Sequence, residues 1–133
     1  MKEHGRITVL VADDEWHIRS ALTDLIEGEP SLRLVAAAPD GTEAVRAAER
    51  HRPMVAIVDV RMPDGGADAV RAIAAVSPST AVVAYSAHSD AITKRDMLAA
   101  GARWFVAKGA PAAELLEAIA DAGGGDGGGR GPA

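Results

Sequence analysis

The chain has 133 residues, including 14 glycines and no cysteine, and its 14 basic and 19 acidic side chains give a formal net charge of −5. Seven of the glycines follow Ala122, which leaves about 122 residues for a folded core, enough for one domain and too few for two. The lack of cysteine excludes disulfides, thiolate metal sites and thiol nucleophiles, and the negative charge gives no general attraction to nucleic acid or to an anionic membrane.

The composition also suggests where the protein works and where its folded part ends. No apolar run reaches the roughly 18–20 residues of a membrane-spanning helix, and the N-terminus lacks the apolar stretch of a signal peptide. We therefore expect a cytoplasmic protein without a membrane partner. We expect its folded domain over residues 1–122 and a Gly-rich flexible tail or linker over residues 123–133.

Strand-like and helix-like segments alternate along the chain. The first strand is a nearly continuous apolar run that ends at two aspartates, which is typical of a strand buried on both faces. Apolar residues then recur at helical spacing until a Gly-Glu-Pro sequence stops the helix. The pattern predicts, in order, strand 7–12, helix 16–26, strand 32–38, helix 41–50, strand 54–58 closing on Asp59, helix 67–76, strand 80–85 ending at Ser86, helix 91–100, strand 103–107 ending at Lys108, and helix 112–122.

Five strands alternating with five helices through short loops predict an α/β fold, with a doubly wound parallel sheet covered by helices on both faces. Ligands of such folds bind beyond the carboxyl ends of the strands, where the strand order reverses. In the flavodoxin-like strand order 2-1-3-4-5, the first and third strands are adjacent at this reversal. The carboxyl ends of the strands are therefore the place where we expect the chemistry.

Polar side chains follow four of the five predicted strands. Asp13 and Asp14 follow the first strand, Asp59 the third, Ser86 the fourth and Lys108 the fifth. With the first and third strands adjacent, the three carboxylates would converge and repel one another unless a cation lay among them. A cluster without Cys or His suits Mg²⁺, or Mn²⁺, which prefer oxygen ligands.

Each of these residues alone has an ordinary structural explanation. An aspartate after a strand is often a turn residue or a helix N-cap, a serine at that place can cap the next helix, and a lysine is usually solvated. Their joint occurrence at the ends of separate strands favours a functional site over coincidence.

The ordered set of motifs resembles the receiver domain of bacterial two-component response regulators over about residues 6–121. The resemblance is carried by the acidic pair Asp13-Asp14, an Asp-x-x-Met-Pro motif that begins at Asp59, the pair Ser86-Ala87, and Lys108. The Asp-Val-Arg-Met-Pro form of the second motif and the Lys-Gly-Ala sequence at Lys108 are similar to the NarL/LuxR-type subfamily.

This resemblance implies a role for each site residue. Asp59 would be the phosphoacceptor, and forming its acyl phosphate is covalent chemistry of the aspartyl-phosphate kind. Asp14, Asp59 and the backbone carbonyl of Arg61 would bind the metal, and Asp13 would act through metal-bound water. Lys108 would pair with Asp59 and then with the phosphoryl oxygens.

The resemblance also implies a switch. The Ser86 hydroxyl and the Ala87 amide would bind the phosphoryl group, and Phe105, at a position where tyrosine is frequent, would turn inward when Ser86 moves. Because phenylalanine lacks a hydroxyl, this switch would work by packing. The surface formed by the fourth helix, fifth strand and fifth helix would carry the output.

The expected partners are a sensor histidine kinase, a second copy of the chain upon phosphorylation, and DNA only through an output domain that the chain lacks, so that transcription control is the expected cellular role. We do not expect an enzyme beyond self-catalysed phosphorylation and dephosphorylation. Three alternatives stay open: a stand-alone receiver, an interaction module that works without phosphate, and a metal-dependent phosphohydrolase with Asp59 as nucleophile, for which loops this short provide little substrate pocket.

Overall fold

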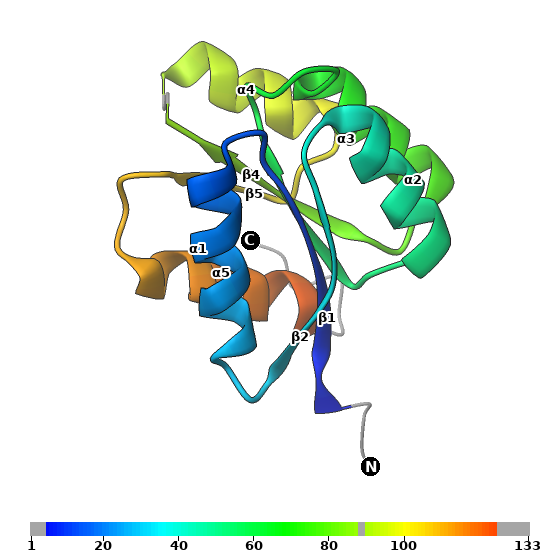
Figure 1. The fold of residues 1–133 in the computed structure, drawn as a ribbon. Coiled ribbons are helices and arrows are strands. Elements are labelled where there is room, and N and C mark those ends of the chain that lie inside the picture. Colours follow the sequence, from blue (N-terminus) through cyan, green and yellow to red (C-terminus); the bar gives the residue numbers. More distant parts are fainter. Residues whose placement is uncertain (1–4, 88–89, 125–133) are drawn as a thin grey trace.

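Five strands and five helices alternate along the computed structural model, which describes residues 5–87 and 90–124 (Figure 1). The strands are β1 (Ile7–Ala12), β2 (Leu32–Ala38), β3 (Val55–Asp59), β4 (Ala81–Ser86) and β5 (Trp104–Ala107). The helices are α1 (Trp16–Glu27), α2 (Gly41–His51), α3 (Gly66–Val76), α4 (Ala91–Ala100) and α5 (Ala112–Gly124).

The last helix differs most from its predicted bounds. It continues two residues beyond Ala122 because Gly123 packs closely on the sheet, where a β-carbon would lie 2.6 Å from the Ile7 side chain and 2.8 Å from that of Val55. The first two glycines of the expected tail therefore belong to a helix, and residues 125–133 lie outside the described residues.

All five strands are parallel, in the order β2-β1-β3-β4-β5, which confirms the predicted fold and strand order. The register aligns Asp59 at the end of β3 with Tyr85 in β4, and Ser86 at the end of β4 with Ala107 in β5. All five strands therefore end at one edge of the sheet, which we call the carboxyl edge, and the residues at their ends are brought together there.

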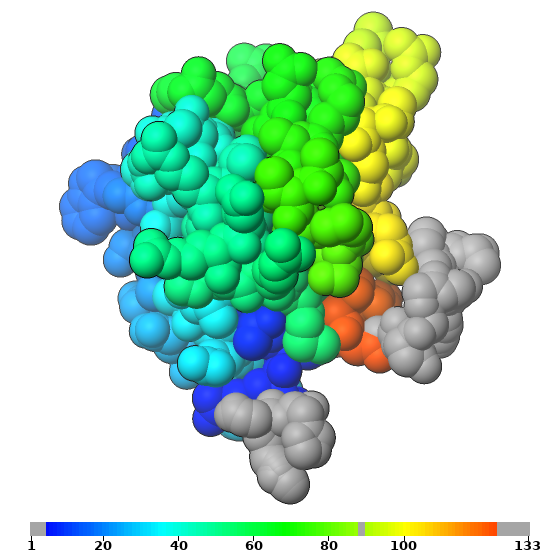
Figure 2. Space-filling model, turned by 90° about the vertical axis from the view of Figure 1, so that its right-hand side faces the viewer, coloured from blue at the N-terminus to red at the C-terminus, as the bar shows by residue number. Residues whose placement is uncertain are grey.

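Helices cover both faces of the sheet (Figure 1). Leu10 of β1 belongs to the core shared with α2, α3 and α4, whereas the neighbouring Val9 belongs to the core shared with α1 and α5, since strand side chains alternate between faces. Figure 2 shows α2, α3 and α4 side by side on one surface of the molecule. Small residues such as Ala44 and Ala48, both fully buried, let α2 lie close to the sheet.

Two helices begin at the carboxyl edge with an aspartate cap. The Glu43 amide of α2 donates to Asp40 Oδ1 at 2.8 Å, and the Thr93 amide of α4 donates to Asp90 Oδ1 at 2.8 Å. The hydrogen bonds from Thr93 lower the pKa of Asp90.

Within residues 5–87 and 90–124, none of the helices has the length and apolar character needed to cross a membrane.

Candidate functional site

Three carboxylates meet at the carboxyl edge of the sheet. Asp13 and Asp14 directly follow β1 and Asp59 ends the neighbouring β3, and each offers an oxygen that lies within 4.8 Å of the others. Asp13 is 0% exposed and Asp59 is 3% exposed, whereas Asp14 is open to solvent. The strand order thus brings together the three acids that the sequence indicated.

Lys108 supplies the positive charge of this cluster. Its ammonium lies 2.9 Å from Asp13 Oδ2 and 3.2 Å from Asp59 Oδ1. The backbone amide of Lys108 donates to the Ser86 carbonyl at 2.8 Å, so the residue is fixed beside the end of β4. Burial by itself would lower the pKa of Lys108, but its hydrogen bonds and attraction to Asp13 and Asp59 raise the pKa overall. The lysine is therefore held in its charged form between two buried acids.

The surroundings of Asp59 disfavour the ionised form of its carboxyl group. Burial raises the pKa of Asp59, and the negative charge of Asp13 raises it further. Two groups lower this pKa without cancelling the rise: the Arg61 amide, which donates to Asp59 Oδ1 at 3.2 Å, and the charged Lys108. One ammonium does not fully balance the charge of this cluster. An additional cation among the carboxylates would stabilise the ionised form of Asp59.

Asp13 is held by the residue that precedes α1 and by a side chain of α1. The Glu15 amide donates to Asp13 Oδ1 at 2.9 Å, and the Arg19 guanidinium donates to the Asp13 carbonyl at 2.8 Å. Glu15 and Arg19 were not among the site residues predicted from the sequence. A helical arginine six residues after an aspartate has no distinctive sequence signal, because its role depends on how its side chain folds back toward the end of β1.

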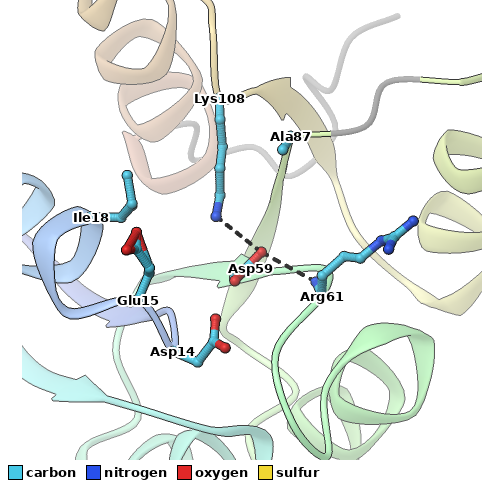
Figure 3. A pocket seen from close by; sticks show the side chains of 7 residues that line it. All are labelled: Asp14, Glu15, Ile18, Asp59, Arg61, Ala87 and Lys108. Atoms are coloured by element: carbon cyan, nitrogen blue, oxygen red, sulfur yellow. Dashed lines mark hydrogen bonds and ion pairs between the residues drawn. The ribbon is translucent and has the colours of Figure 1, made fainter.

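A pocket of about 320 Å³ opens beside the carboxylates. In Figure 3 the Asp14, Asp59 and Lys108 side chains point toward one another, and the Arg61 side chain extends away from them. The pocket is lined by Asp14, Glu15, Ile18, Asp59, Arg61, Ala87 and Lys108. Five of these were singled out from the sequence; Glu15 is the residue before α1, and Ile18 lies in the first turn of that helix.

The remaining predicted residues lie around this pocket at different depths. Ser86 is completely buried at the end of β4, and Ala87 lines the pocket. Phe105 in β5 is half-buried and packs on the core shared with α2, α3 and α4.

Tyr85 was not among the site residues predicted from the sequence. It packs on the opposite face of the sheet from Phe105, and Lys108 Nζ lies 5.7 Å from the centre of the Tyr85 ring. In the sequence Tyr85 is simply the last apolar residue of a strand, so its contact with Lys108 is visible only in the structure.

The cluster fits a hard divalent cation. Its side-chain donors are all carboxylate oxygens, from Asp13, Asp14 and Asp59, and the pocket is lined by Asp14 and Asp59. Mg²⁺ and Mn²⁺ favour such oxygen ligands, and Mg²⁺ in particular keeps several of its waters and binds few protein groups.

The fold and the acidic cluster can be compared with those of known protein families. The family described as "Response regulator receiver domain" matches residues 9–120. This chain belongs to that family. Receiver domains are phosphoacceptor signalling domains of two-component systems, and the family binds Mg²⁺ at an acidic pocket. The resemblance of the sequence to such domains is thereby confirmed.

Relatives of this receiver domain carry different outputs. It is 32% identical over 120 residues to the DNA-binding transcriptional activator DevR/DosR of Mycobacterium tuberculosis, covering 90% of this chain and 55% of that protein. It is 35% identical over 123 residues to protein-glutamate methylesterase/protein-glutamine glutaminase 1 of Myxococcus xanthus, covering 90% of this chain and 35% of that protein. The chain therefore spans about a third to a half of these relatives.

A solved structure supports the NarL/LuxR-type resemblance. The signal receiver domain of the response regulator NarL from Mycobacterium tuberculosis superposes with a TM-score of 0.86 at 30% sequence identity, covering 90% of this chain and 98% of that one.

Proposed function

We propose that Asp59 of this receiver domain accepts a phosphoryl group from the phosphohistidine of a sensor histidine kinase. The observation that carries the proposal is the place of Asp59: it ends β3, is 3% exposed, pairs with Lys108 at 3.2 Å and lines a pocket that it shares with Asp14. A carboxylate oxygen of Asp59 attacks phosphorus, the phosphorus–nitrogen bond breaks, and the histidine nitrogen keeps the electron pair. The product is an acyl phosphate on Asp59.

Asp14, Asp59 and the Arg61 carbonyl would hold Mg²⁺, or Mn²⁺, and Asp13 would act through a metal-bound water. The hydrogen bonds of Asp13 support this division, since its Oδ1 accepts the Glu15 amide and its Oδ2 pairs with Lys108, whereas Asp14 is exposed at the pocket. When bound, the ion neutralises negative charge on the phosphoryl oxygens.

Three further groups would receive the transferred phosphoryl, which brings a charge of roughly −1.5 to −2 and three acceptor oxygens. The Lys108 ammonium is already at the carboxylate that is modified. The Ser86 hydroxyl stands at the end of β4, the Ala87 amide belongs to the next residue, and Ala87 lines the pocket. A movement of Ser86 toward the phosphoryl group would let half-buried Phe105 pack further inward, and this packing change would alter the surface of α4, β5 and α5.

We infer that the output is control of transcription, through a DNA-binding domain of the complete regulator and with homodimerisation on phosphorylation. The likeness to DevR/DosR and to the NarL receiver supports this output, and the likeness to a methylesterase supports a different one. The reading frame beyond Ala133 discriminates between them: a helix-turn-helix domain is expected, and an enzyme domain would contradict the inference.

The phosphoacceptor proposal is tested with beryllium fluoride, which mimics the phosphoryl group on a carboxylate. We expect the wild type to bind it only with Mg²⁺ present, as a thermal stabilisation, and Asp59→Asn to show no response. Acetyl phosphate should add one phosphoryl mass to the wild type and none to Asp59→Asn. Light scattering before and after the addition of beryllium fluoride tests whether the chain dimerises on phosphorylation.

An equal response of wild type and Asp59→Asn would contradict the assignment of Asp59 as phosphoacceptor. Partner binding that is unchanged in Asp59→Asn would favour an interaction module that works without phosphate.

A further inference from the structure

The loop that carries Arg61 is fastened to the start of a helix that contributes no side chain to the pocket. This β3–α3 loop, residues 60–65, connects Asp59 to α3 and packs against the N-terminus of α2. The Gly41 amide donates to the Pro63 carbonyl at 2.8 Å, and the Thr42 hydroxyl donates to Asp64 Oδ2 at 3.0 Å. We call these two hydrogen bonds, with the close backbone approach at Gly41, the α2 clamp.

Gly41 is the tightest point of the α2 clamp. A β-carbon on Gly41 would lie 1.6 Å from the Asp64 carbonyl oxygen and 2.3 Å from the Asp64 carbonyl carbon. Both obstacles are backbone atoms, so no side-chain rotation relieves the clash. Asp64 itself has a φ of 56°, in the left-handed region that non-glycine residues rarely adopt. The loop therefore keeps this unusual conformation in direct contact with Gly41.

The other end of the loop is fastened to the sheet. The Val60 amide donates to the Tyr85 carbonyl at 3.1 Å, and the Arg61 amide donates to Asp59 Oδ1 at 3.2 Å. A turn with the Gly65 amide 3.0 Å from the Met62 carbonyl closes the loop before α3. Arg61 thus lies between an attachment at the end of β3 and the α2 clamp at Pro63 and Asp64.

We propose that Gly41 and Thr42 are positioning residues, which set the Mg²⁺ affinity of the site by holding the Arg61 backbone in place. This inference rests on the proposed metal-binding role of the Arg61 carbonyl. Mg²⁺ demands nearly ideal geometry, so a ligand on a loop depends on what fixes that loop. The α2 N-terminus, which does this, follows β2 in the chain, the strand that ends without a polar residue at the pocket.

The inference is tested by Mg²⁺ titration, followed by the amide NMR shifts of Asp14 and Arg61. Gly41→Ala must push the loop away, and we expect its Mg²⁺ affinity to fall by about 10-fold or more, the usual effect of losing a residue that orients a metal ligand. Gly123→Ala is the matched control, because its β-carbon also meets packed atoms, but those of Ile7 and Val55 at the opposite end of the strands. We expect this control to be destabilised and to keep the wild-type Mg²⁺ affinity.

A second pair of variants applies if Gly41→Ala does not fold. Thr42→Val removes the hydroxyl from an exposed residue, and about a two- to fivefold loss of affinity is expected for one hydrogen bond, with Thr42→Ser restoring the wild-type value. Wild-type affinity in every variant that folds would overturn the inference, as would equal losses in Gly41→Ala and Gly123→Ala. A wild type that binds no Mg²⁺ would instead overturn the proposed function.

Discussion

Lys108 and Asp59 form an ion pair at the carboxyl edge, with the ammonium 3.2 Å from Asp59 Oδ1 and also 2.9 Å from Asp13 Oδ2. The fifth strand thereby supplies the cation for two buried carboxylates that come from two other strands. Removing the cation leaves like charges close together in a poorly hydrated place, where their repulsion is strong. The same contact therefore contributes to the stability of the fold and to the charge of the site.

Lys108→Met is expected to destabilise the metal-free protein by about 1–3 kcal/mol, because it leaves two buried acids without their partner. The measurement is urea unfolding in the presence of EDTA. Lys94→Met, which removes an exposed lysine from α4, is the control and should change the free energy of unfolding by less than about 0.5 kcal/mol. Equal stabilities of the two variants would contradict the importance of the ion pair.

Asp59→Asn is expected to stabilise the metal-free protein increasingly as the pH rises. Burial, with the charge of Asp13, raises the pKa of Asp59 above its ordinary value of 3.8, so the folded protein binds this proton more tightly than the unfolded chain does. The contribution of protonated Asp59 to the free energy of unfolding is complete below pH 3.8 and is lost as the pH rises through the folded-state pKa of Asp59. Asparagine cannot lose a proton, so the variant escapes this loss.

The measurement is the difference in free energy of unfolding between Asp59→Asn and wild type, in EDTA, at a series of pH values. The difference should grow with pH and then level off, and Mg²⁺ should reduce it by stabilising the wild type. Asp121→Asn, an exposed change of the same kind on α5, corrects for net charge. A difference that shrinks with rising pH would contradict the raised pKa of Asp59.

The fold and the acidic cluster follow from the sequence because both depend on local patterns. Buried parallel strands are short apolar runs, and an aspartate directly after such a run must lie at the carboxyl edge. The strand order then makes Asp13 and Asp59 neighbours. Elements whose ends are marked by charged or turn residues, such as β1 and α4, have the predicted bounds.

Contacts that depend on tertiary approach do not follow from the sequence. Arg19 reaches the Asp13 carbonyl, Tyr85 lies beside Lys108, and Gly41 touches the loop after Asp59 only because separate elements pack together. The end of α5 illustrates the same point, since glycine disfavours helices but Gly123 fits a space on the sheet that a larger residue would overfill. Packing outweighs local preference at that position.

Tyr85 is expected to report on Lys108. Burial raises the pKa of the Tyr85 hydroxyl, and the positive charge of Lys108 partly offsets this effect. Lys108→Met should therefore raise the Tyr85 pKa further, whereas Lys94→Met should leave it unchanged. As the chain has one tyrosine, ring-labelled tyrosine gives a single NMR signal that can be followed over the pH range in which the protein stays folded. A lower Tyr85 pKa in Lys108→Met would contradict the contact.

Two adjacent glycines at the end of α5 are expected to respond in opposite ways to substitution by alanine. A β-carbon on Gly123 would lie 2.8 Å from the side chain of Val55, which is fully buried and β-branched and therefore cannot move aside, so Gly123→Ala should destabilise the protein by about 1–3 kcal/mol. Gly124 has no atoms within 4 Å of such a position, so Gly124→Ala should be neutral or stabilising by up to about 1 kcal/mol through helix propensity. Urea unfolding of both variants makes the comparison. A neutral Gly123→Ala would mean that the last turn of α5 is not packed on the sheet and that the folded part ends at Ala122.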